Sequence, residues 1–155
     1  MVLFPSYRDV NNPRKLKPTG QKLIVHNSAK KTHNTKLNGG ADNPENNKTL
    51  EPGTKLDPIA LNPSKTVVKI ECGIHQWMDA YARVFDHPYA AVSLVTKDEK
   101  DDKFGTYEIK DVPAGVKLRV VAWHEDAGFL EGSKGVEVEL DKGKTKTQDF
   151  TLKAK

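Results

Sequence analysis

Residues 66–78 read TVVKIECGIHQWM and combine an alternating apolar pattern with the densest group of metal-binding side chains in the chain. Val68, Ile70 and Cys72 fall on one face of an extended segment, and the residues between them fall on the other. A period of two is typical of a β-strand that buries one face. The pattern therefore predicts a strand whose buried face ends at Cys72, followed directly by a loop that carries other ligands.

Short segments of the same kind recur along the chain, separated by Gly and Pro turns, and none has a sustained helical period. Further strands are predicted at 22–26, 55–61, 80–85, 90–96, 107–110, 116–124, 135–140 and 147–152. Helix is limited to one turn around 76–81. Residues 1–20 are rich in Pro, Asn, Lys and Arg and are predicted to be irregular. Residues 38–63 hold five Asn, four Pro and three Gly and are predicted to be a long loop apart from the strand at 55–61. The expected fold class is all-β, an antiparallel sandwich.

Composition excludes several classes of protein. Among the 155 residues, 25 Lys and Arg stand against 21 Asp and Glu, and residues 1–66 hold eleven of these bases but only five of the acids. Aromatic residues are absent from 8–76, so the basic half lacks a base-stacking platform and nucleic-acid binding is not expected. No apolar run is long enough for a membrane span. The sequence also lacks the nucleotide-binding and metalloprotease motifs of common enzymes.

Cys72, His75 and Met78 follow one another at C-x2-H-x2-M spacing. Thiolate and thioether are soft ligands that favour Cu(I), and imidazole accepts either oxidation state of copper. A structural zinc site takes four Cys or His ligands, and Met78 is a poor substitute for one of them. Copper is therefore the expected cofactor. The competing interpretation is a buried structural thiol with an incidental His and Met nearby.

A type 1 copper site needs a second histidine. His33 and His26 are the candidates, because each is followed by Asn. His26 belongs to the predicted strand at 22–26, whereas His33 is expected on a loop that packs beside the Cys72 loop. His33 is therefore preferred.

Two segments carry a resemblance to a known family: VHNSAKKTHN at 25–34 and ECGIHQWM at 71–78. They resemble the cupredoxins, with the first similar to plastocyanin and the second similar to amicyanin in its spacing. The resemblance implies a Greek-key β-sandwich in which His33, Cys72, His75 and Met78 bind a type 1 copper that shuttles single electrons between redox partner proteins. It also implies that Asn34 ties the two ligand loops together. Trp77 is unusually bulky for a position so close to copper and would shield the site or conduct electrons.

The resemblance to cupredoxins covers about residues 20–86, so residues 1–86 are expected to form the copper-binding domain. About two strands precede the His-Asn segment in a full cupredoxin, and residues 1–20 do not look like them, so a truncated start is expected. Residues 87–155 resemble a carboxypeptidase-regulatory-like β-sandwich and would form an extension packed on the first domain. The whole arrangement resembles exported bacterial cupredoxin-domain or methylamine-utilisation proteins. That resemblance implies a periplasmic or extracellular protein whose leader has been removed.

Two further histidines lie in the extension. His87 precedes Pro88 and most simply satisfies a turn backbone, and His124 ends a strand face beside Glu125, where a polar contact is the simplest role. A second metal site formed by His87 and His124 is the less favoured interpretation.

The expected function is electron transfer without catalysis. Its rivals are a copper carrier or storage protein, a copper enzyme with an open coordination position, and a metal-free β-sandwich interaction module.

Overall fold

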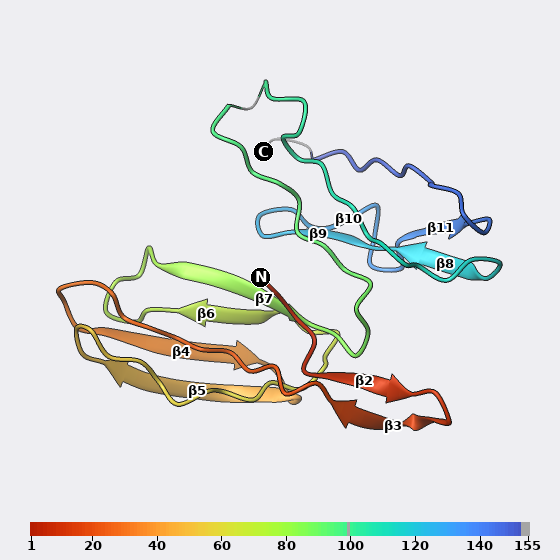
Figure 1. Cartoon of the computed structure of the whole chain (residues 1–155). Coiled ribbons are helices and arrows are strands. Elements are labelled where there is room, and N and C mark those ends of the chain that lie inside the picture. Colours follow the sequence, from red (N-terminus) through yellow and green to blue (C-terminus); the bar gives the residue numbers. More distant parts are fainter. Residues whose placement is uncertain (99, 153–155) are drawn as a thin grey trace. The chain divides into compact units, whose positions relative to one another are not determined.

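The computed structural model describes residues 1–98 and 100–152 (Figure 1). The described residues form strands and loops without helix, which confirms the all-β class. None of them forms a helix that is long and apolar enough to cross a membrane. The strands are β1 (Val2–Leu3), β2 (Ser6–Asp9), β3 (Asn12–Pro18), β4 (His33–Gly39), β5 (Asn43–Leu50), β6 (Val68–Glu71), β7 (Asp79–Val84), β8 (Lys117–Val120), β9 (Ala122–His124), β10 (Gly128–Leu130) and β11 (Val136–Glu139).

The chain divides into two compact units, Met1–Ile109 and Lys110–Lys155. The first unit contains a five-stranded sheet with the order β1-β7-β6-β4-β5. In this sheet β1 runs parallel to β7, and the other neighbours are antiparallel. Strands β6 and β7 confirm the alternating segments predicted at 66–72 and 80–85. The helical turn expected around 76–81 is wrong, because residues 73–77 form turns and bends and β7 begins at Asp79.

One face of this sheet covers the core of the first unit. The buried cluster consists of Leu3, Leu23, Leu37, Leu61, Val68, Ala82 and Val84. Two of its members come from the extended segments 22–26 and 55–61, which lie against the sheet but are not the strands predicted there. These segments meet at the isolated bridges Leu23–Ile59 and His26–Lys55 and through a backbone bond of 3.0 Å from the Leu56 N–H to the Val25 carbonyl, and they do not form a continuous ladder. Pro58 lies between the two bridges and has no N–H to donate to a ladder, which interrupts regular pairing.

The irregular lead-in predicted for residues 1–20 is wrong. Residues 6–18 form the β2–β3 hairpin, and Val2–Leu3 pairs with β7. The carboxylate of Asp9 accepts a hydrogen bond from the backbone of Asn11 at 2.9 Å and pairs with Lys17 Nζ at 2.9 Å, and both contacts lower the pKa of Asp9. A hairpin held by such polar contacts carries little hydrophobic alternation, so its sequence looks like a loop.

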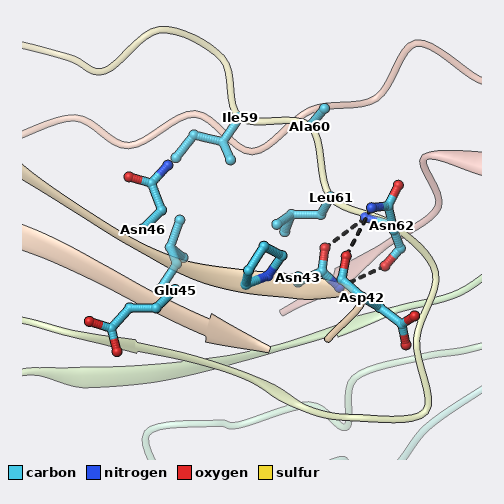
Figure 2. Close-up of a pocket in the computed structure, with 10 residues that line it drawn as sticks. Asp42, Asn43, Glu45, Asn46, Ile59, Ala60, Leu61 and Asn62 are labelled. Carbon is cyan, nitrogen blue, oxygen red and sulfur yellow. Dashed lines mark hydrogen bonds between the residues drawn. The ribbon is translucent and has the colours of Figure 1, made fainter. Parts of the chain in front are cut away.

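The long loop predicted at 38–63 is also wrong over its first half, where β4 and β5 form a hairpin. Gly39 makes that hairpin fit, because a Cβ there would come within 2.7 Å of Val68. At the start of β5, the buried Asn43 side chain accepts from the backbone N–H of Asn62 at 2.7 Å and donates to its carbonyl at 2.9 Å (Figure 2). This clamp fastens the start of β5 to the segment that carries Leu61. Strand β5 is polar because it lies at the sheet edge.

The second unit contains two antiparallel pairs, β8 with β11 and β9 with β10. The strand predicted at 116–124 is present as two strands, β8 and β9, and β11 confirms the one predicted at 135–140. The segments 90–96, 107–110 and 147–152 are not strands. Where a hairpin is expected between the first two, Leu94 forms backbone bonds with Gly105 and Thr106, each 2.8 Å long.

The boundary between the compact units lies between residues 109 and 110. The sequence resemblance to cupredoxins, by contrast, ends at about residue 86. The two divisions rest on different criteria. The loop from 85 to 109 belongs to the first unit by its packing.

Candidate metal centre

Strand pairing brings the two predicted ligand segments together. Strand β4 pairs with β6 in a register that sets Lys36 opposite Glu71 and Leu37 opposite Ile70. Continued past the last pair, this register brings the first residues of β4 beside the residues that follow β6. His33 is the first residue of β4, so the expectation that it lies on a loop is wrong. Its position at the strand start fixes its backbone more firmly than a loop would.

Three ligand atoms converge at this edge of the sheet. His33 Nδ1 lies 3.6 Å from Cys72 Sγ, His75 Nδ1 lies 3.7 Å from the same sulfur, and the two nitrogen atoms are 3.1 Å apart. Cys72 is buried and both histidines are half-buried. Within the described residues, His33, Cys72 and His75 form a group that could hold a metal ion.

The separations of the three atoms fit ordinary coordination bonds. Two metal–nitrogen bonds of about 2.0 Å that meet at about 100–120° place their nitrogen atoms about 3.1–3.5 Å apart. A metal–nitrogen and a metal–sulfur bond of about 2.0 and 2.3 Å at about 110–120° place nitrogen and sulfur about 3.5–3.7 Å apart. The observed 3.1, 3.6 and 3.7 Å fall within these ranges. The three atoms are therefore spaced as the ligands of a single metal ion would be.

The surroundings of Cys72 favour its thiolate. Burial by itself raises the pKa of the thiol, but hydrogen bonds from the backbone of Asn34 and from the side chain of His33 lower it, as do the backbone and side chain of His75. The result is a pKa of about 6, well below the ordinary 9.0. The thiolate is the form of cysteine that binds metals, so the site favours the ligand form before any ion arrives.

Asn34 connects the two ligand segments. Its Oδ1 accepts a hydrogen bond from the backbone N–H of Ile74 at 3.2 Å and one from the Cys72 thiol at 3.4 Å. Its Nδ2 donates to Oδ1 of Asn47 on β5 at 2.8 Å. These contacts join Asn34 on β4 to the loop that follows β6, and the role in metal binding that the cupredoxin resemblance implies for Asn34 stays a prediction. Asn47 had not been identified from the sequence, because its segment was predicted to be a loop.

The loop from Cys72 to Met78 is closed by its own backbone. The N–H of Cys72 donates to the carbonyl of Met78, and the N–H of Met78 donates to the carbonyl of His75, both at 3.0 Å. The Met78 side chain is 43 % exposed. The loop thus places Met78 next to the triad in the chain, and a bond from its sulfur to a metal stays a prediction.

Trp77 contacts the triad from the solvent side. Its side chain is 79 % exposed, and its ring meets that of His75 edge-on with the ring centres 5.3 Å apart. Trp77 therefore covers one side of a half-buried histidine while most of its own surface faces water.

His26 lies apart from the triad. It is exposed, and its backbone bridges to Lys55. The neighbouring Asn27 is buried, and its Nδ2 donates to the carbonyls of Lys31 and Leu50, at 2.8 and 3.0 Å. Asn27 therefore shapes the turn that leads into β4, and the structure brings His33 rather than His26 to Cys72.

His87 and His124 belong to different compact units, and each is described separately. The Nδ1 atom of His87 is buried and has no hydrogen-bond partner in the described part of the chain, so the expected bond from it to a turn backbone is not formed. The His87 ring packs between Phe85 and Tyr89, with ring centres 5.1 and 5.9 Å away. His124 accepts from the backbone N–H of Asp126 at 3.2 Å, the polar contact that was expected. A shared metal site stays a prediction.

The cavity shown in Figure 2 is separate from the triad and lies beside the hydrogen bonds between Asn43, at the start of β5, and Asn62. Its volume is about 260 Å³ and its lining includes Leu37, Ile59 and Leu61. The Asn43 and Asn62 side chains at its wall are already hydrogen-bonded, and the carboxylates of Asp42 and Glu45 point away from each other. Among the described residues, the candidate metal ligands therefore remain those of the triad.

Comparison of the chain with known protein families, with curated proteins and with solved structures found no match.

Proposed function

We propose that this protein is a type 1 copper protein of the cupredoxin kind that carries single electrons between redox partners. The observation that carries the proposal is the convergence of one cysteine sulfur and two imidazole nitrogens with separations of 3.1–3.7 Å. Two His and one Cys in a trigonal arrangement are the ligands of blue-copper electron-transfer sites. Met78 would supply the weak axial ligand.

Copper bound at this position would supply reversible one-electron chemistry. The task of the protein is to keep the ligands still while the charge changes. His33 is fixed by the β4 ladder, and Cys72 and His75 are fixed by the closed hairpin loop. Backbone N–H groups of Asn34 and His75 donate to the Cys72 sulfur, and hydrogen bonding around this sulfur tunes the reduction potential of blue-copper sites.

The ligand set favours copper over zinc. Closed zinc sites take four Cys or His ligands, and in the described chain the triad has three. The remaining candidate ligand, Met78, is a thioether, which suits copper in its reduced state. The Greek-key cupredoxin topology, a location outside the cytoplasm and a redox partner protein complete the proposal, and each rests on the sequence resemblance of 25–34 and 71–78.

The proposal is tested by loading the reduced protein with Cu(II) and recording its visible and electron paramagnetic resonance spectra. We expect an intense thiolate-to-copper absorption that Cys72→Ser abolishes and that His33→Ala removes or shifts strongly. His26→Ala is the matched control, because His26 also precedes an Asn but lies apart from the triad. Its spectrum should equal that of the wild type.

The other outcomes separate the rival functions. Stoichiometric copper without the absorption band would replace electron transfer with a carrier or open-site function, and a spectral response to small anions would indicate the open site. No retained copper with Cys72 fully reduced would support a metal-free interaction module.

A further inference from the structure

Asn47 lies on the edge strand β5, outside both ligand segments, yet it reaches the residue that connects them. Its Oδ1 accepts a hydrogen bond of 2.8 Å from Nδ2 of Asn34. In the β4–β5 register Asn34 is opposite Thr49, and Asn47 is opposite Lys36, so Asn47 is the diagonal neighbour of Asn34. Diagonal neighbours on one face of an antiparallel pair are within reach of each other's side chains.

The bond from Asn47 determines which way the Asn34 amide faces. An amide group has a donor end and an acceptor end of nearly equal size, and its orientation follows from its hydrogen bonds. An acceptor at Asn47 holds the Nδ2 end of Asn34 toward β5. The Oδ1 end is thereby turned toward the backbone N–H of Ile74, which is a donor whether Cys72 is a thiol or a thiolate.

The packing around Gly73 supports the same conclusion independently. A Cβ built on Gly73 would lie 3.3 Å from Nδ2 and 3.5 Å from Oδ1 of Asn34. The loop backbone therefore passes close to the flat face of the amide and leaves little room for it to tilt. A rotation of the amide by half a turn would then exchange its ends in place and set Nδ2 against the N–H of Ile74, donor against donor.

We propose that Asn47 is a positioning residue for the metal-ligand loop. It fixes the orientation of the Asn34 amide, and that amide in turn holds the segment between Cys72 and His75. The part of its test that measures copper release rests on the proposed copper function, whereas the part that measures hydrogen exchange does not. Loss of Asn47 would free the Asn34 amide to turn, and the N–H of Ile74 would lose its fixed acceptor.

The test combines two measurements on the full-length chain. The first is hydrogen exchange of the Ile74 backbone amide in the metal-free protein, followed by NMR. The second is the rate at which Cu(I) passes from the loaded protein to a chelator. Since a hydrogen bond of this kind changes an equilibrium by a factor of roughly five, we expect Asn47→Leu to accelerate both by about that factor.

Three variants provide the controls. Asn47→Asp keeps an acceptor at the same position and should retain slow exchange at Ile74. Thr49→Val changes the residue directly opposite Asn34 without removing the Asn47 acceptor, and both rates should stay at the wild-type value. In an Asn34→Ala background, Asn47→Leu should have no further effect, because coupled residues are not additive.

The proposal is overturned if Ile74 exchanges at the wild-type rate in Asn47→Leu, or if the two substitutions add. It is also overturned if the amide of the buried residue Ala82 on β7 accelerates as much as that of Ile74, since Asn47 would then only stabilise the sheet. If the wild type binds no Cu(I), the proposed copper function fails, while the exchange measurement on Ile74 still decides the role of Asn47.

Discussion

Ionisation of the Cys72 thiol gives the most direct test of the triad in the metal-free protein. Burial raises the pKa of this thiol, and hydrogen bonds from the backbone and side chains around it outweigh burial and lower the pKa to about 6. The donors come from His33, Asn34 and His75, which lie on two separate segments. A lowered pKa therefore requires both segments to be in place without a metal.

The expected effect is large. A thiol with a pKa of about 6 is roughly 90 % ionised at pH 7, whereas one at the ordinary value is roughly 1 % ionised. Because Cys72 is the single cysteine of the chain, the ultraviolet absorbance of the thiolate reports this site alone. Cys72→Ser supplies the baseline. We expect a titration step near pH 6 in the wild type and a step shifted upward in His33→Ala, which removes one of the donors.

The same group links stability to pH. Since the pKa of Cys72 is lower in the folded protein than in the unfolded chain, its thiolate stabilises the fold at high pH. This contribution is complete above pH 9.0, decreases as the pH falls, and is lost near pH 6. The urea midpoint of the wild type, measured relative to that of Cys72→Ser, should therefore fall as the pH is lowered from the higher to the lower of these two values. A thiol step near pH 9.0 in the native protein would refute the reasoning, because the triad would then not be assembled without metal.

Three other predictions concern the surroundings of the triad. Gly73→Ala places a Cβ 3.3 Å from the Asn34 amide, so we expect faster Cu(I) release with an unchanged urea midpoint. Release rates that are equal in the variant and the wild type would contradict the tight packing. Leu37→Ala should lower the free energy of unfolding by about 2–5 kcal/mol in a urea titration, because this core side chain is 3 % exposed, and a loss below that range would mean that the site collapses around the smaller residue. Trp77 should lose fluorescence when Cu(II) binds, because its ring centre is 5.3 Å from that of His75. Trp77→Phe should remove most of this response and leave only the emission of Trp123, the other tryptophan of the chain.

The ligand triad could be predicted because its signal is local. The spacing of Cys72 and His75 lies within one loop, and the alternation of Val68 and Ile70 sets the face on which Cys72 is buried. The choice of His33 over His26 also came from local pattern. It placed the right histidine in the site even though the segment expected to be a strand, 22–26, forms only bridges.

Two of the missed strands, β3 and β5, share a physical cause. Strand β5 lies at the sheet edge, and β3 pairs only with β2, so both keep most of their side chains in water. Neither strand needs an apolar face, and their Asn, Lys and Pro residues give them the composition of loops. Asn47 was therefore placed in a predicted loop, and its contact with Asn34 depends on a pairing that a local pattern does not contain.

The geometry of the triad depends on the register between β4 and β6, and that register is set by the core. A slip of one residue would move His33 by about 3.4 Å and turn its side chain to the opposite face of the sheet. Leu37 on β4 and Val68 on β6 oppose such a slip, because each is buried in the core cluster and would be exposed by it. Gly39 adds a steric constraint, since any other residue carried to its position would collide with Val68. Apolar core residues therefore set the register that brings the two histidine nitrogens and the cysteine sulfur to separations of 3.1–3.7 Å, and the Asn34 amide and the loop backbone hold them there without an ion.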